Sequence, residues 1–211
     1  MILLGKEIQF PKVETASPEG IVAVGGDLSS KRLILAYKSG VFPWYNEGEP
    51  IIWYSPDPRM VLFPKNLKIS KSMKSILRKK EFKVTFNQNF DGVIAQCKNT
   101  YRKDQGGTWI TNDMQKAYNK LHELGIAKSV EVWQNNVLVG GLYGIDLGTI
   151  FCGESMFSKI SNASKIAFIY LTQKLENENY KLIDCQVYNN HLASLGAEEI
   201  SRKDFIHFLK N

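Results

Sequence analysis

The sequence predicts an α+β protein in two parts, a small N-terminal α/β domain and a larger domain built on a mixed, mainly antiparallel sheet. Residues 1–60 are rich in Pro and Gly, which leaves room only for short strands and one helix. From about residue 60 onward, helical and strand-like patterns alternate. There a meander of strands precedes an apolar helix and a further strand. We place the domain boundary between residues 60 and 61.

The composition indicates a folded chain, and the cysteine pattern does not favour a metal site. Hydrophobic residues make up 44% and charged residues 23% of the 211 residues, which is far from a disordered composition. The apolar start ends at Lys6 and Glu7, so we expect neither a signal peptide nor a membrane span, and a cytoplasmic location. The cysteines are odd in number and widely spaced, which favours neither disulfides nor a zinc site. We expect no metal and no cofactor.

In the N-terminal part, one helix is predicted over residues 31–38. Ser29 or Ser30 precedes it as a suitable N-cap, and Gly40 follows it as a stop signal. The proline and glycine residues on either side of this helix favour turns between short strands.

In the second part, the order of elements predicts a central helix packed on a sheet. Thr111 is a suitable cap for a helix whose apolar stripe ends at Leu124. Asn135 and Asn136 form the turn of a predicted hairpin, and Asn189 can cap a short helix. The predicted strands are 129–134, 137–145, 149–154 and 181–185, the apolar helix is 162–175, and a strand and a short helix follow residue 199.

The segment from Lys65 to Lys83 concentrates positive charge in a chain of net charge +6. Glu81 is its only acidic residue. Apolar residues at helical spacing predict one packed face and one cationic face, which suits either contact with nucleic acid phosphates or ordinary solvation. The candidate phosphate-binding residues are Lys71, Lys74, Arg78, Lys79, Lys80 and Lys83.

Several short motifs occur together in a fixed order, and the set is more specific than any single fragment. They include the sequences GTWI, LVGGLYG, FCGESMFS and LIDCQVYNNHLASLGA. The segments concerned are Glu19–Tyr45, Trp53–Leu62, Gly107–Ile110, Ser129–Trp133, Leu138–Gly144, Phe151–Ser158, Asn162–Lys165 and Leu182–Ala197.

In this order the motifs resemble the bacterial leucyl/phenylalanyl-tRNA-protein transferases across nearly the whole chain. The resemblance implies a C-terminal acetyltransferase-like (GNAT-like) domain. It also implies transfer of Leu or Phe, and also Met, from aminoacyl-tRNA to the α-amine of proteins with N-terminal Lys or Arg. The product would be a peptide bond and a destabilising N-terminus that leads to protein degradation. Tyr54 departs from the family pattern, in which a second Trp is common.

The junction at residues 157–163 distinguishes the implied tRNA-dependent transferase from a coenzyme A-dependent N-acetyltransferase. Acetyltransferases of that fold bind pyrophosphate on a glycine-containing loop at a helix N-terminus, and this junction lacks glycine. An aminoacyl-tRNA, such as Leu-tRNA or Phe-tRNA, fits better because its RNA can be bound elsewhere. A non-catalytic RNA-binding protein would explain the basic segment but not the polar residues described next.

For the aminoacyl side chain, the resemblance implies an apolar pocket. Such a pocket distinguishes ligands mainly by size and shape. The alternative for each residue is an ordinary place in the core. The residues implied are Trp44, Trp109, Phe151, Met156, Leu142 and Ile183.

For the chemistry, the resemblance implies that Gln186, Asp184 and Glu154 form the polar centre of the site. Asp184 and Gln186 are two apart on a predicted strand and so share a face. A purely structural hydrogen-bond network is the alternative. A nucleophilic pair of Cys185 and His191 is a further alternative, which strand alternation disfavours because it turns Cys185 away from that face.

Overall fold

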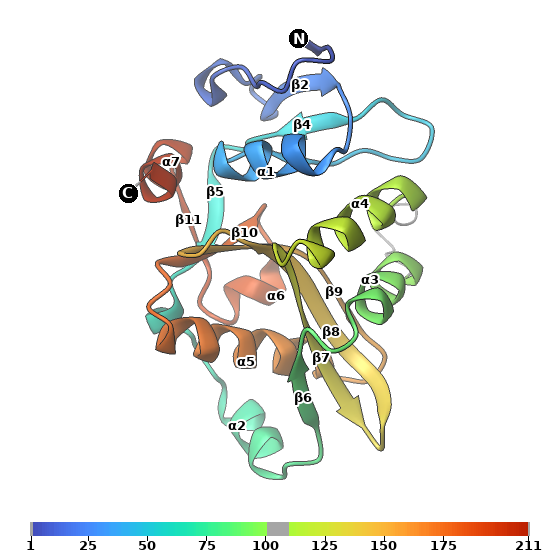
Figure 1. The fold of residues 1–211 in the computed structure, drawn as a ribbon. Helices are drawn as coiled ribbons and strands as arrows, with labels where there is room; N and C mark the ends of the chain where they lie inside the picture. The colour runs from blue at the N-terminus through green and yellow to red at the C-terminus, as the bar shows by residue number, and fades with distance from the viewer. Residues whose placement is uncertain (1, 101–109, 211) are drawn as a thin grey trace.

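The computed structural model describes residues 2–100 and 110–210 and has two sheets with helices around the larger one (Figure 1). The small sheet has the strand order β1-β2-β4-β3, and the large sheet has the order β11-β5-β10-β9-β8-β7-β6. The β9–β10 pair is parallel, whereas the other neighbours in the large sheet are antiparallel. The predicted α+β class with a mixed, mainly antiparallel sheet is confirmed.

The small sheet carries the predicted N-terminal helix, α1. The Ser29 hydroxyl accepts a hydrogen bond from the Arg32 N–H, and Gly40 has a φ of +77°, which suits a residue that ends a helix. Both predicted boundaries of this helix are therefore confirmed. The elements are β1 (Leu3–Leu4), a 3₁₀ turn (Val13–Thr15), β2 (Ile21–Gly25), α1 (Ser30–Lys38), β3 (Phe42–Pro43) and β4 (Ile52–Tyr54).

The large sheet contains the predicted meander. Asn135 and Asn136 have φ values of +50° and +61°, as a tight hairpin turn requires. The third strand of the meander is four residues longer at its C-terminal end than predicted. The strands are β5 (Arg59–Leu62), β6 (Lys83–Phe86), β7 (Ala127–Gln134), β8 (Val137–Asp146), β9 (Ile150–Ser158), β10 (Leu182–Gln186) and β11 (Glu198–Ile200).

Helices cover both faces of the large sheet (Figure 1). On one face α3 and α4 pack in the same core cluster as the small sheet, and on the other face α5 packs with α2 and α6. The predicted central helix is confirmed as α5, which is buried along most of its length. The helices are α2 (Lys71–Arg78), α3 (Phe90–Asn99), α4 (Asn112–Glu123), α5 (Ala163–Asn177), α6 (Asn190–Ala193) and α7 (Arg202–Lys210), with a 3₁₀ turn at Pro64–Asn66.

Helix α4 confirms one prediction and corrects another. The Thr111 hydroxyl accepts a hydrogen bond from the Met114 N–H, as expected of a cap. Leu124, however, is 53% exposed and does not belong to the buried stripe. It is the C-cap residue, where the chain leaves the helix axis before Gly125, which has a φ of +76°. Helical periodicity therefore no longer decides which way its side chain points.

The chain passes from the small sheet to the large one between β4 and β5, and α1 lies against α4. The domain boundary between residues 60 and 61 stays a prediction. Within residues 2–100 and 110–210, every helix is too short or too polar to cross a membrane.

Candidate functional site

The site lies where β9 and β10 separate. Their pairing ends at Asp184 and Cys152, and each strand has a bulge just beyond that point. In β9 the extra residue is Glu154, which lies between two residues that pair with adjacent residues of β8. In β10 the extra residue is Cys185. Bulges bend a strand and redirect its side chains, and these two open the sheet between neighbouring strands.

A cavity of about 510 Å³ occupies this opening. Phe151 and Met156 both line it, although they are five residues apart and would point to opposite faces of a regular strand. The bulge at Glu154 adds one residue between them and so brings both side chains to the same side. Trp44 reaches the cavity from the end of β3.

The structure brings most of the predicted site residues to this cavity. Trp109 lies outside the described residues. The predicted apolar residues that line the cavity are Trp44, Leu142, Phe151, Met156 and Ile183, and the predicted polar residues that line it are Glu154, Asp184 and Gln186.

Asp184 is a fully buried carboxylate held by Arg59. Arg59 Nε donates to Asp184 Oδ1 over 2.8 Å and Nη2 donates to Oδ2 over 2.7 Å, so the pair is bidentate. The guanidinium lies between the rings of Phe42 and Phe205, 4.8 and 4.5 Å from their centroids, and donates to the Gly40 carbonyl. The charge of Asp184 is thus balanced, and its position is fixed by β5, β3 and α7.

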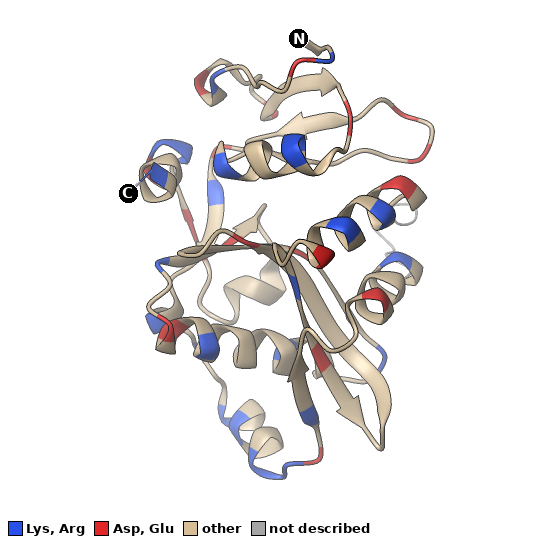
Figure 2. Ribbon diagram, in the orientation of Figure 1, with Lys and Arg blue, Asp and Glu red and all other residues tan. Residues whose placement is uncertain are grey.

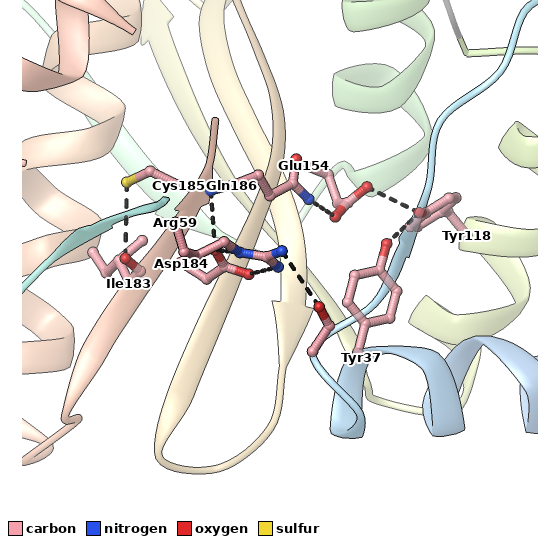
Figure 3. A network of polar contacts seen from close by, with 9 residues as sticks. Tyr37, Arg59, Tyr118, Glu154, Ile183, Asp184, Cys185 and Gln186 are labelled. Carbon is pink, nitrogen blue, oxygen red and sulfur yellow. Dashed lines mark hydrogen bonds and ion pairs between the residues drawn. The ribbon is translucent and has the colours of Figure 1, made fainter. Parts of the chain in front are cut away.

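Gln186 is held in a strained backbone conformation by Asp184. Its φ is +65°, in the left-handed region that residues other than Gly and Asn rarely adopt. The Gln186 N–H donates to Asp184 Oδ1 over 2.9 Å. Asp184 therefore acts on the backbone of Gln186 and leaves the side-chain amide free to reach Glu154 (Figure 3).

Glu154 is buried among uncharged donors. Gln186 Nε2 donates to its Oε1 over 2.7 Å, and the Tyr118 hydroxyl donates to its Oε2 over 2.9 Å. The Tyr37 hydroxyl forms a further hydrogen bond with that of Tyr118 (Figure 3). Burial raises the pKa of Glu154 to about 8, the nearby charge of Asp184 adds to the rise, and the donated hydrogen bonds oppose it. A carboxyl group with a pKa near neutrality can both accept and release a proton.

Sequence reasoning missed three residues of this network. Arg59 had one usable signal, a single cation inside the apolar run RMVL, because such a residue needs a buried partner. In the sequence, Tyr118 fits the apolar stripe of the helix that follows Thr111, and Tyr37 lies inside the helix predicted over residues 31–38. Nothing local distinguishes either hydroxyl from those of other core tyrosines.

Cys185 lies in the cavity wall, but its environment disfavours a nucleophilic thiolate. Its Sγ points away from the side chain of Gln186, toward the Ile183 carbonyl 3.8 Å away (Figure 3). Burial raises the pKa of this thiol, with the charge of Asp184 adding to the rise. The Cys185 and His191 pair therefore lacks the lowered thiol pKa that such a nucleophile needs.

The N-terminus of α5 is partly closed by the chain itself. The Ala163 N–H donates to the Ile160 carbonyl, and the Ser164 N–H donates to the Ser158 hydroxyl over 3.3 Å. Both groups are therefore already used within the protein. The expectation that no pyrophosphate binds here stays a prediction.

The basic segment folds as expected around α2 (Figure 2). Met73 is buried and provides the packed face, and the Ser70 hydroxyl caps the helix. Glu81 pairs with Lys79 at 3.9 Å. The six candidate tRNA-binding residues, Lys71, Lys74, Arg78, Lys79, Lys80 and Lys83, are all exposed.

Among residues 2–100 and 110–210, His, Cys, Asp and Glu side chains form no group of three or more that could hold a metal ion.

Comparison with known proteins gives a consistent match. Residues 61–210 match the family profile described as leucyl/phenylalanyl-tRNA protein transferase, and residues 26–57 match the N-terminal domain of that family. A leucyl/phenylalanyl-tRNA–protein transferase of Flavobacterium johnsoniae is 64% identical over 211 residues, which cover 100% of both chains. That of Christiangramia forsetii is 58% identical over 99% of this chain and 100% of its own.

Solved structures give more distant matches. A GCN5-related N-acetyltransferase from Kribbella flavida has a TM-score of 0.42 and 11% identity, over 80% of this chain and 60% of that one. The L-PGS of Bacillus licheniformis has a TM-score of 0.43 and 14% identity, over 73% and 56% of the two chains.

Proposed function

Since the chain belongs to the leucyl/phenylalanyl-tRNA protein transferase family, we propose that it moves Leu or Phe, and also Met, from aminoacyl-tRNA to proteins that begin with Lys or Arg. The enzyme is an aminoacyltransferase. The transferred residue would become the new N-terminus of the acceptor and would mark that protein for degradation.

The observation that carries this proposal is a single cavity with an apolar wall beside a polar row of side chains. Trp44, Leu142 and Ile183 provide an apolar surface for the amino acid side chain. Glu154 and Gln186 line the same cavity. An ester whose side chain lies on the apolar wall would therefore present its carbonyl near these polar groups.

The reaction is an aminolysis of an ester. The acceptor nitrogen attacks the ester carbonyl carbon, the bond from that carbon to the ribose oxygen breaks, the amine loses a proton and the ribose oxygen gains one. A protein α-amine has a pKa of about 7.7 to 8.0, so roughly a tenth of it is neutral at pH 7 without help. Placement of the two substrates can then supply much of the acceleration.

We assign Gln186 the role of orienting the attacking amine through its amide oxygen, because Nε2 is already donated to Glu154. Asp184 is a positioning residue, since its carboxylate holds the Gln186 N–H and is otherwise occupied by Arg59. Glu154 would move protons between the amine and the ribose oxygen. Its pKa of about 8 suits both directions of transfer. Its ionised form would also favour a cationic acceptor residue.

We assign a role to each of the two predicted domains, residues 1–60 and residues 61–211. The first part would contribute Trp44 and Pro43 to the rim of the aminoacyl pocket. The second would contribute the polar residues and the basic helix α2. Exposed lysines and arginines suit sequence-independent contacts with the backbone phosphates of tRNA.

The direct test uses radiolabelled Leu-tRNA and two peptides that differ only in an N-terminal Arg or Gly. We expect label to move to the first peptide alone. Gln186→Glu should lower kcat strongly, because ionised Glu cannot donate to Glu154 and its charge repels it. Met156 is a half-exposed residue of the cavity wall. Met156→Trp should raise KM for Leu-tRNA, because the larger side chain fills the space for the amino acid. Unchanged transfer by both variants would refute the assignment of the cavity.

Binding of tRNA provides a second test with a matched control. The triple variant Lys71→Ala, Lys74→Ala, Arg78→Ala should weaken tRNA binding. It should also reduce the slope of log affinity against log salt by about 0.7 to 0.9 for each phosphate that the variant no longer neutralises. A control triple variant at the exposed residues Lys12, Lys31 and Lys38 removes the same charge from the N-terminal part. Equal slopes for the two triple variants would contradict a specific role of α2.

A further inference from the structure

A second, smaller cavity lies beneath the C-terminal half of α5. Its volume is about 170 Å³. The base is formed by Phe86 from β6 and Val130 from β7, and Leu175 from α5 covers it. It also contains polar groups, because the Asp146 carboxylate lines it and accepts a hydrogen bond from the Tyr180 hydroxyl over 2.7 Å.

Two side chains line both this cavity and the aminoacyl cavity. They are Phe151 at the start of β9 and Leu171 on α5. Phe151 is 2% exposed and Leu171 is 4% exposed, so both lie in the protein interior. They therefore form a wall, two side chains wide, between the two cavities.

The two side chains of this wall differ in how easily a substitution can shorten them. A Cβ atom on Gly144 would lie 2.5 and 2.8 Å from ring carbons of Phe151, so the ring occupies the space left by the missing side chain of Gly144. Phe151 is thus fixed against the backbone of β8. Leu171 projects from the helix, and shortening its side chain need not disturb the strand pairing. Leu171 is consequently the adjustable part of the wall.

We propose that Leu171 and Phe151 form a partition that sets the upper size limit of the transferred side chain, with the second cavity as an extension that accepts an indole once the partition is opened. This inference rests on the proposed function, because it takes the first cavity as the aminoacyl pocket. An apolar pocket rejects larger ligands by steric exclusion. A buried indole also needs an acceptor for its N–H, and Asp146 supplies a carboxylate in the lining of the second cavity.

The experiment compares transfer of Trp and Phe from their aminoacyl-tRNAs by the full-length protein and its variants. Leu171→Ala opens the partition and should raise the ratio of kcat/KM for Trp to that for Phe by about tenfold or more. Leu171→Val should give a smaller rise. Leu175→Ala is the matched control, since Leu175 lies one turn further along α5 and lines only the second cavity. It should leave the ratio as in the unmodified protein.

Different outcomes would reject the partition and the proposed aminoacyl transfer. Equal ratios for Leu171→Ala and Leu175→Ala, with Phe still transferred, would overturn the partition. If circular dichroism shows that Leu171→Ala does not fold, the ratio of kcat/KM for Trp to that for Phe is compared between Leu171→Val and Leu175→Ala instead. Failure of the unmodified protein to transfer Leu or Phe would instead reject the proposed function, and transfer that neither Gln186→Glu nor Met156→Trp changes would reject the assignment of the first cavity.

Discussion

Two buried carboxyl groups lie in one cavity, and the hydrogen-bond donors around them differ in charge. Asp184 faces the guanidinium of Arg59, which carries a full positive charge. The Glu154 carboxyl group accepts hydrogen bonds from the amide of Gln186 and the hydroxyl of Tyr118, which carry none. Hydrogen bonds satisfy both carboxyl groups. Charge compensation, rather than hydrogen bonding, is what distinguishes them.

The difference assigns separate tasks to the two groups. A carboxylate paired with arginine in a bidentate manner is held in a fixed position, which suits a residue that holds the strained backbone of Gln186. A carboxyl group buried without a cation has a pKa near 8 and exchanges protons around neutral pH. Asp184 and Glu154 could exchange these tasks only if the hydrogen-bond donors around them were exchanged as well.

Removal of the cation beside Asp184 should have the largest effect. Arg59→Met leaves a buried carboxylate without its partner, which typically costs about 3 to 5 kcal/mol of unfolding free energy. Denaturant titration measures this loss. The double variant Arg59→Met, Asp184→Leu should recover much of the stability without activity, because no buried charge remains. A stable single variant would show that the pair contributes little.

Removal of the ionisable group at Glu154 should change how stability depends on pH. The pKa of Glu154 is raised from 4.5 to about 8 in the folded protein, so the folded state binds the extra proton between those values. The unmodified protein should therefore lose stability as the pH rises from about 4.5 to about 8. Glu154→Gln should lack this contribution, and its advantage over the unmodified protein should grow with pH. A pH-independent difference between the two unfolding curves would contradict the raised pKa.

A smaller effect is expected from the hydroxyl next to Glu154. Tyr118→Phe removes one hydrogen bond from the carboxyl group, worth about 0.5 to 1.5 kcal/mol. It should move the alkaline limb of the pH profile of kcat upward, because the variant lacks one interaction that lowers the pKa of Glu154. Tyr180→Phe is the control, since that hydroxyl bonds to Asp146 outside the first cavity. Identical pH profiles for the two variants would exclude Tyr118 from the network.

The fold was predictable where its determinants are local. Ser29, Thr111 and Asn189 each cap the helix expected of them, because a cap depends on the next three residues only. Strand β6 and helix α3 were not foreseen. The ion pair of Arg59 and Asp184 spans 125 positions, so it depends on strand order rather than on any local pattern.

The site was predictable in its residue types but not in its geometry. Alternation along a strand assumes an unbroken ladder, and two bulges break that ladder where Glu154 and Gln186 lie. Whether a bulge forms depends on the partner strand, which the order of residues in one strand does not reveal. Resemblance to a family supplied what spacing alone could not.

The bulge in β9 also makes Glu154 removable without a change of register. Because Gly153 and Ser155 already pair with adjacent residues of β8, deleting Glu154 would restore a continuous ladder and leave Met156 opposite Leu142. The apolar wall of the cavity would be retained, while its ionisable group would be lost. In this strand, one extra residue supplies the proton-exchanging group and the regular ladder supplies the lining.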